Sequence, residues 1–226
     1  MSRLRRRPAA GDDGVSLPEL IVTMALLGLF TTLVMLLVTS VSRSFTTERS
    51  ATSSTMAAST GMNELTRVVR SGTVLQIVTG GADEPVFLDA RANSMILYAY
   101  IDTSGAAPRP VKIQFSVDAQ QRLRETRWNA TASKAPWTFD STPRPARTIA
   151  TSVVTTATQP LFTYYNKDGN ALPVPAGGTL SAADRKLVAA VQIHLTVQSD
   201  TTGRAEPVEI SNTVSIPNLG VTRVRP

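Results

Sequence analysis

The sequence contains no cysteine, a single histidine and few aromatic residues, which make up 5% of its 226 residues. The lack of cysteine excludes a disulfide scaffold, a thiolate zinc site and a cysteine nucleophile. The single histidine, His194, excludes a metal site built from several histidines. It is also the only candidate for a Ser/His triad, and the sequence has no GxSxG motif to supply the serine. We therefore interpret His194 as an exposed residue on a strand and expect a protein without enzymatic activity.

Charged residues are scarce as well, at 18%, and the formal net charge is only +6. A DNA-binding surface needs basic residues gathered together, usually with aromatic residues between them for stacking. Arg122, Arg124 and Arg127 are spaced closely enough to contact DNA, but no such aromatic pattern accompanies them. We interpret the three arginines as the solvated face of a strand and expect no nucleic-acid partner.

The strongest signal is the apolar stretch at residues 15–41, VSLPELIVTMALLGLFTTLVMLLVTSV. Between Leu20 and Thr39 it has 20 residues without a charge, enough for a helix to cross the ~30 Å hydrocarbon core of a membrane. Four arginines lie in the first seven residues, and few basic residues follow the stretch closely. The positive-inside rule therefore predicts a cytoplasmic N-terminus, with the rest of the chain outside.

A cleaved signal peptide and a simple membrane anchor are two interpretations of this stretch. A signal peptide has a shorter apolar run, of ~7–15 residues, although small residues near Ser40 would allow cleavage. A simple anchor accounts for the length and the orientation but not for Glu19, at the start of the apolar run. A carboxylate at the centre of a membrane helix costs ~2.5–3.5 kcal/mol, and less near its edge, so an acid in such a helix usually has a function.

The residues around Glu19 favour a third interpretation. Gly14 followed by VSLPEL resembles the processing site of type IV prepilins and of type II secretion pseudopilins. In these proteins a basic leader ends in glycine, and an apolar residue, Ser or Thr, Leu, a variable residue and Glu precede a long apolar run. The resemblance implies a leader of residues 1–14, cleavage between Gly14 and Val15 by a prepilin peptidase, and N-methylation of Val15. It also implies that Glu19, the fifth residue of the mature chain, acts in assembly.

Three positions depart from the commoner family pattern. Val15 stands where phenylalanine is usual, and Pro18 stands where a branched residue is more frequent, although proline suits the first turn of a helix. Leu36 replaces a proline that bends the helix in many members, so any bend here would come from Gly28 or from the neighbouring threonines.

The resemblance further implies what the protein does and where. It would be a structural minor pilin or pseudopilin, held in the cytoplasmic membrane by one helix before an inner-membrane assembly platform inserts it into a filament. Its partners would be other pilins or pseudopilins, bound through the N-terminal helix, in a type IV pilus or a type II secretion pseudopilus. A DNA-uptake minor pilin and a single-pass membrane protein with an outer ligand-binding domain remain as alternatives.

The rest of the chain predicts an α+β fold, and the resemblance implies that it is of the type IV pilin kind. The resemblance also implies that residues 15–41 form the transmembrane and filament-core helix and that residues 42–71 continue this helix outside the membrane. Residues 42–60 hold 11 serines and threonines, which are poor helix formers, so the alternative is a linker followed by a separate helix. In the final part, Met62, Leu65 and Val69 recur with helical spacing.

Residues 72–226 are expected to form a globular domain in which an antiparallel β-sheet packs on the second half of the helix. Residues 129–147 and 172–183 are expected to be loops, and residues 111–128 a hairpin. The order of the elements resembles that of J-type minor pseudopilins, including the stretch from Tyr164 to Leu172. The predicted strands are Thr73–Val78, Met95–Ile101, Val111–Val117, Arg122–Trp128, Leu161–Tyr165, Val188–Gln198 and Val208–Ile216.

Two smaller features of this domain concern metal binding and packing. Asp168-Gly169-Asn170 could form a calcium loop, but calcium needs about six oxygen ligands and this stretch supplies few, so we expect a turn and no cofactor. Trp128 and Trp137 flank a predicted loop, and we interpret them as packing residues.

Overall fold

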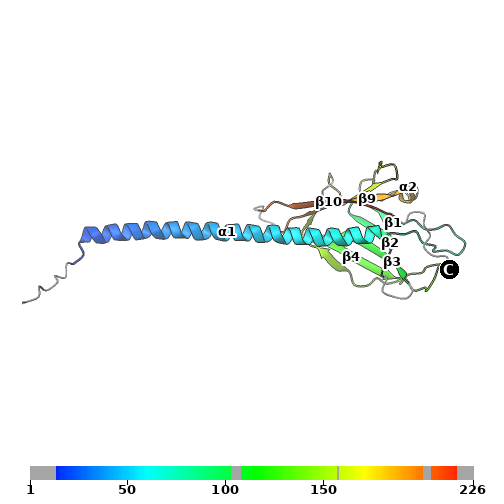
Figure 1. Cartoon of the computed structure of the whole chain (residues 1–226), viewed down its shortest axis with the longest axis horizontal. Helices are drawn as coiled ribbons and strands as arrows, with labels where there is room; N and C mark the ends of the chain where they lie inside the picture. The colour runs from blue at the N-terminus through cyan, green and yellow to red at the C-terminus, as the bar shows by residue number, and fades with distance from the viewer. Residues whose placement is uncertain (1–13, 103–107, 157, 201–204, 218–226) are drawn as a thin grey trace, which may run out of the picture. The chain divides into compact units, whose positions relative to one another are not determined.

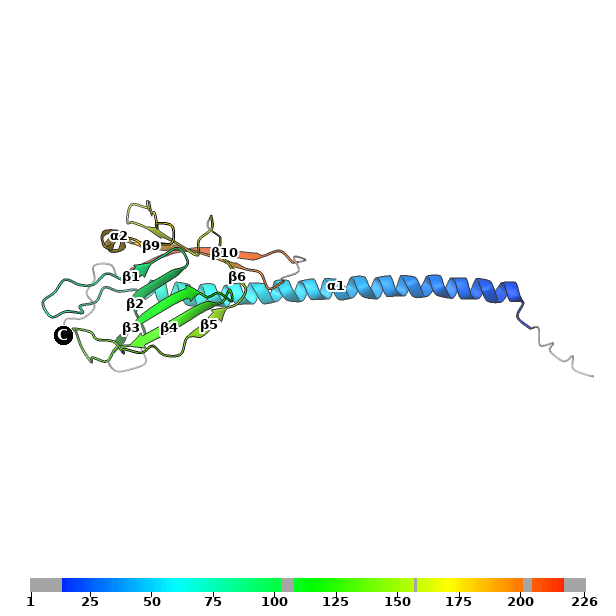
Figure 2. The ribbon, with the colours of Figure 1, turned by 180° about the vertical axis from the view of Figure 1, so that it is seen from behind.

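The computed structural model describes residues 14–102, 108–156, 158–200 and 205–217 (Figures 1 and 2). The chain divides into two compact units, Met1–Thr46 and Thr47–Pro226. The long helix α1, Leu17–Arg70, begins in the first unit and supplies the first element of the second unit, which we call the body. The helix predicted over residues 15–71 is therefore confirmed, with ends that differ by one or two residues.

The part of α1 rich in serine and threonine is helical, and several of its hydroxyl groups bond within the helix. Ser44 and Thr46 donate to the carbonyl oxygens of Ser40 and Ser42, at 3.2 and 2.9 Å. Thr55 donates to the carbonyl oxygen of Ala51, at 2.9 Å. Such bonds to the preceding turn satisfy the hydroxyl without breaking the helical ladder. The expectation of one continuous helix is therefore confirmed, and the alternative with a separate linker is not.

The first sheet is antiparallel and has the strand order β1-β2-β3-β4-β5. The predicted hairpin corresponds to β3 and β4, which pair from Val111 and Asn129 to Val117 and Leu123. Its turn is closed by the Asp118 carboxylate, which accepts from the backbone N–H of Gln120 and of Arg122, at 3.0 and 2.9 Å. The strands are β1 Phe87–Ala90, β2 Ser94–Asp102, β3 Arg109–Val117, β4 Leu123–Asn129 and β5 Arg147–Ala150.

The second sheet has the order β10-β9-β7-β8, and β6 also pairs with β9. On the long strand β9, Val191, Ile193, Leu195 and Val197 are buried on one face, as the period of two along a strand places them. A short helix, α2 (Ala182–Leu187), precedes β9, with Ser181 as its N-cap. The strands are β6 Val153–Val154, β7 Phe162–Tyr165, β8 Ala171–Leu172, β9 Ala190–Val197 and β10 Val208–Ser215.

One hydrophobic core joins the C-terminal part of α1 to both sheets. A Cβ added to Gly61 would lie 3.0 Å from Leu195 Cδ2 on β9 and 3.1 Å from Ala150 Cβ on β5, so the helix approaches both sheets closely at this residue. Figures 1 and 2 show this part of α1 running alongside strands of the two sheets. The α+β fold is confirmed, and the structure adds that the sheet is divided in two. The buried helical residues are Ser54, Ala58, Gly61, Met62, Leu65, Val68 and Val69.

The prediction of a strand at Thr73–Val78 is wrong. This segment makes only one isolated bridge, between Leu75 and Glu84. Leu75 is buried in a smaller cluster with Tyr98, Ala130 and Trp137, so its apolar residues serve packing rather than a sheet. Four strands were also not predicted, because β1, β5, β6 and β8 have only two to four residues and depend on their neighbours for pairing.

The polar face of β9 is less exposed than expected. The His194 side chain is only 24% exposed, so it is partly buried and not fully exposed as predicted. Thr196, on the same face, is buried. The reason is that β9 is an inner strand, with β10 on one side and β6 and β7 on the other. Glu209, on β10, lies 3.8 Å from His194 Nε2.

The two tryptophans pack as expected. Trp137 is buried, and its ring meets Tyr100 edge to face at a centroid distance of 6.4 Å. Trp128 is half-buried beneath Lys112, whose Nζ lies 4.5 Å from the ring centroid, a cation–π contact between paired positions of β3 and β4.

Candidate functional site

The predicted processing site lies immediately before α1. Gly14 and Val15 are exposed and belong to no helix or strand, and no described residue apart from the chain neighbour of Gly14 lies within 4 Å of a Cβ placed on it. Exposed, irregular backbone is where proteases cut most readily, because cleavage there requires no unfolding. The rest of the predicted leader, residues 1–13, lies outside the described residues.

The helix begins in a way that suits this position. The first helical hydrogen bond runs from Leu20 N to Ser16 O, at 3.1 Å, so Ser16 is the N-cap residue. Pro18 follows in the first turn, where the N–H that it lacks would have no helical partner. Glu19 lies three residues after the cap, which is the spacing of a capping box. Its negative charge is stabilised by the positive, N-terminal end of the helix dipole. A cut between Gly14 and Val15 would leave this helix start intact.

The part of α1 before Thr47 is mostly apolar, and its side chains are exposed in the part of the chain that the structure describes. Its large apolar side chains from Leu17 to Val41 are 40–73% exposed. Among the described residues, α1 is the one helix long and apolar enough to cross a membrane. Length and composition are thus compatible with the predicted single membrane span.

The threonines in this apolar stretch do not leave unpaired hydroxyl groups. Thr31 and Thr32 donate to the carbonyl oxygens of Leu27 and Gly28, each at 2.8 Å. Thr23 and Thr39 bond in the same way, to Leu20 O at 2.9 Å and Met35 O at 2.7 Å. Because an unsatisfied polar group costs several kcal/mol in hydrocarbon, these bonds remove an obstacle to burial in lipid or between helices.

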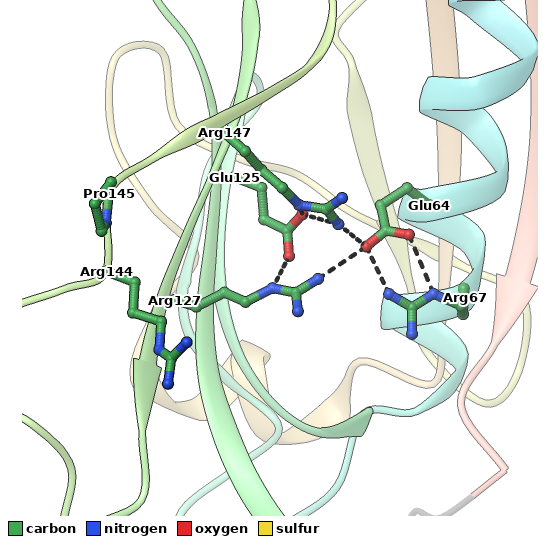
Figure 3. A pocket seen from close by; sticks show the side chains of 7 residues that line it. All are labelled: Glu64, Arg67, Glu125, Arg127, Arg144, Pro145 and Arg147. Atoms are coloured by element: carbon green, nitrogen blue, oxygen red, sulfur yellow. Dashed lines mark hydrogen bonds and ion pairs between the residues drawn. The ribbon is translucent and has the colours of Figure 1, made fainter. Parts of the chain in front are cut away.

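A second polar feature lies in the body, where α1, β4 and the segment at Arg144–Arg147 meet (Figure 3). It is a pocket of about 410 Å³, which we call the arginine pocket. Its lining holds four arginines and two glutamates, so its formal charge is +2. The lining residues are Glu64, Arg67, Glu125, Arg127, Arg144, Pro145 and Arg147.

The two carboxylates of the arginine pocket share the same guanidinium groups. Glu64 Oε1 accepts from Arg67 Nη2 at 2.7 Å and from Arg127 Nη2 at 3.1 Å, and it also pairs with Arg147. Glu125 accepts from Arg127 Nε and from Arg147 Nε, the latter at 2.5 Å. Figure 3 shows the guanidinium groups of Arg127 and Arg147 between the two glutamates. Charge-assisted bonds therefore join α1 to β4 and β5.

Opposing effects act on the Glu64 carboxyl. Partial burial by itself would raise its pKa, because burial penalises the charged form. The hydrogen bond from Arg67 and the charges of Arg147 and Arg127 outweigh burial and hold the pKa of Glu64 below its ordinary value of 4.5. Glu64 is therefore ionised at neutral pH.

The three arginines predicted to form one solvated strand face do not lie together. Arg127 belongs to the arginine pocket, on the same face of β4 as Leu123 and the fully buried side chain of Glu125. Arg122 pairs with Asp118 at 2.8 Å, and Arg124 donates to Ala146 O at 2.9 Å. The sequence did hold a signal for this, since a period of two along β4 places Glu125 and Arg127 on the face of the buried Leu123.

The Asp168-Gly169-Asn170 stretch forms the turn between β7 and β8, as predicted. The Asn166 side-chain oxygen accepts from Asp168 N and Asn170 N, at 3.0 and 2.9 Å, and Gly169 has a φ of +80°, which favours glycine. Among the described residues, no group of three or more His, Cys, Asp or Glu side chains is placed to hold a metal ion.

Two comparisons with known proteins found no match to the chain. No protein-family model matches the chain, and no curated protein shows significant sequence similarity to it. The segment from Gly14 to Glu19 and the helix that follows it are therefore the features of the chain that indicate a function.

Proposed function

We propose that the chain is a structural subunit of a type IV pilus or a type II secretion pseudopilus, made as a prepilin with a 14-residue leader. The observation that carries the proposal is the arrangement at the start of α1. A glycine suited to cleavage lies just before the helix, and an acid in the first turn is followed by a long apolar stretch. Neither a simple anchor nor a signal peptide accounts for the combination of that acid, the glycine before it and the apolar stretch after it.

The properties of α1 support the same function. Among the described residues, the large apolar side chains of α1 up to Val41 are exposed, whereas the part after Thr47 is anchored in the body by its buried face. Such a helix can be held in the cytoplasmic membrane first and pack against equivalent helices of other subunits later. The subunit would catalyse nothing itself, and its partners would be the prepilin peptidase, the assembly platform and other pilins.

Glu19 has a physical role in this proposal. When apolar helices pack together, a buried carboxylate without a partner is strongly unfavourable, so it needs a cation. The N-terminal amine that cleavage creates on Val15 of a neighbouring subunit would supply that cation. The pair would then set the axial position of one subunit relative to the next, which apolar contacts alone specify poorly.

The test is the chemical identity of the N-terminus. The full chain is produced in cells that carry a prepilin peptidase and in cells that lack it, and the membrane-extracted protein is examined by intact mass and N-terminal peptide mapping. We expect a mature chain that begins with N-methylated Val15 only when the peptidase is present. An uncleaved N-terminus would favour a simple anchor, and cleavage near Ser40 would favour a signal peptide.

Two arginine substitutions sharpen this test. Gly14→Arg should block maturation, because the resemblance implies a peptidase that accepts only a very small residue before the cut. Gly11→Arg adds the same charge three residues earlier in the leader and should be processed normally. Normal processing of Gly14→Arg would contradict the prepilin proposal.

A further inference from the structure

We propose that the arginine pocket is a binding site for a compact dianionic group that carries oxygen acceptors, such as a phosphate or a pair of carboxylates. The proposal stands on the pocket itself and does not depend on the filament function. Guanidinium groups recognise both kinds of oxyanion through paired N–H donors. A volume of about 410 Å³ lies within the range of small-ligand pockets.

The pocket presents its positive groups to the solvent and keeps its negative groups inside. The side chain of Glu125 is 0% exposed and that of Glu64 is 15% exposed. The side chains of Arg67 and Arg147 are 47% and 51% exposed. An incoming group therefore meets guanidinium ions first, although both carboxylates belong to the same cluster.

Arg144 is the least compensated of these charges. Among the described residues, no carboxylate lies within ion-pair distance of it, whereas Arg67, Arg127 and Arg147 each pair with Glu64. In the Asn129 amide orientation that satisfies both its oxygen and its nitrogen, the oxygen accepts hydrogen bonds from Arg144 Nη2 at 2.6 Å and from Arg144 Nε at 2.8 Å. A neutral amide thus holds this guanidinium in place without neutralising it. Figure 3 shows Arg144 and Arg67 at opposite sides of the pocket.

Unused donors remain on all four arginines. Each guanidinium has five N–H groups, and the bonds of the arginine pocket all start from Nε or Nη2. The four Nη1 groups have no hydrogen-bond partner among the described residues. A bound oxyanion would accept from these groups, and a charge of −2 would balance the formal charge of the lining. The ion pairs already present keep the guanidinium groups in place before the ligand arrives, which lowers the entropy cost of binding.

The test is a calorimetric titration of the full chain in a non-ionic detergent, at mildly alkaline pH and constant ionic strength. Sodium phosphate and sodium succinate are the two probes, and sodium acetate is the monoanionic control. We expect saturable binding of one equivalent of phosphate or succinate, with acetate binding at least about ten-fold more weakly. Binding of phosphate would indicate a phosphorylated ligand, and binding of succinate alone would indicate the carboxylates of an acidic peptide.

Three variants locate the binding. Arg144→Gln should weaken binding about ten-fold or more, since each charge-assisted hydrogen bond contributes that much. It leaves no carboxylate unpaired, so the fold should persist, and Arg67→Gln provides an independent second variant. Arg91→Gln removes an equally exposed arginine, paired with Asp89 at 2.7 Å outside the pocket, and should change nothing. Absence of saturable binding, or equal binding by wild type and the Arg67/Arg144 double variant, would overturn the proposal.

Discussion

Glu64 on α1 and Arg127 on β4 form an ion pair, with Oε1 and Nη2 3.1 Å apart, although 63 residues separate them in the chain. Glu125, two residues before Arg127, shares the same guanidinium from a fully buried position. The C-terminal part of α1 is thus attached to the first sheet by charge as well as by apolar packing. This attachment has a consequence for stability that depends on pH.

The first prediction concerns that dependence. Because the pKa of Glu64 is lower in the folded protein than its ordinary value of 4.5, the carboxylate stabilises the fold fully above that pH. The stabilisation is lost as the pH falls below 4.5 and through the lower pKa of the folded state. Glu64→Gln should lower the free energy of unfolding by about 1–3 kcal/mol at neutral pH, as loss of a charged hydrogen-bond partner typically does. The difference from wild type should shrink in acid.

The measurement is denaturant unfolding of the full chain in detergent, followed by tryptophan fluorescence at several pH values. Both tryptophans, Trp128 and Trp137, lie in the body, so the signal reports its unfolding alone. Glu48→Gln serves as the control, since it makes the same change at an exposed carboxylate of α1 that has no ion pair among the described residues, and it should change little at any pH. If the difference in the free energy of unfolding between wild type and Glu64→Gln stayed constant as the pH was lowered, the role of the Glu64 carboxylate in stability would be contradicted.

The second prediction concerns the close approach of α1 to both sheets at Gly61. Gly61→Leu should destabilise the body by about 1–3 kcal/mol, because the new side chain meets Leu195 and Ala150 at distances that leave no room for it. The control is Thr60→Leu, at the exposed neighbouring position. Its free energy of unfolding should stay within about 0.5 kcal/mol of the wild-type value. Denaturant unfolding of the two variants checks this. Equal stabilities would mean that the helix does not pack against the sheets at Gly61.

The third prediction concerns the part of α1 that belongs to the body. A chain that begins at Thr47 should be soluble, monomeric and rich in both helix and sheet, because it keeps every buried residue of α1 from Ser54 to Val69. A chain that begins at Gly72 should aggregate, because it exposes the apolar surface that the helix covers. Size-exclusion chromatography and circular dichroism distinguish the two outcomes. If the shorter chain were equally soluble and folded, the helix would not be part of the core.

The fourth prediction concerns Glu19 and rests on the proposed function. Glu19→Leu should enter the membrane and be cleaved normally but be recruited poorly into filaments, because it cannot pair with the N-terminal amine of a neighbour. Glu19→Gln should be nearly as defective, because it keeps an acceptor for the helix N-terminus but loses the charge. Glu19→Asp should be partly defective, because its side chain is one methylene shorter. Co-purification with sheared filaments is measured beside membrane level and mature mass.

Glu48→Gln provides the matched control for this series. Glu48 is an exposed acid of α1 that follows the apolar stretch, so its neutral variant should assemble like wild type. Wild-type incorporation of Glu19→Leu would remove the assembly role and leave the simple anchor as the better interpretation.

Local patterns predicted much of the fold. The last turns of the helix and the β3–β4 hairpin follow from periodicity and turn residues over short distances in the chain, and the structure confirms both. The continuity of the helix through residues 42–60 was implied by the resemblance rather than by helix propensity, and the structure confirms it as well. Thr73–Val78 has a strand-like pattern too, but only a single bridge pairs it, at Leu75 and Glu84. The short strands β1, β5, β6 and β8 were missed for the opposite reason, since their pairing comes from neighbours rather than from their own sequence.

The two candidate sites, the processing site and the arginine pocket, also differ in whether local sequence could reveal them. Gly14, Val15 and Glu19 could be selected from the sequence because they lie within a single stretch, residues 14–19, and their spacing relative to the apolar run carries the signal. The arginine pocket could not, because it combines α1, β4 and β5 through contacts between residues that are 22 to 83 positions apart. Whether a glutamate on a strand is solvated or buried among arginines depends on which surface the strand faces. The sequence alone thus determined the helix and its apolar start, whereas only tertiary packing decided which charges meet.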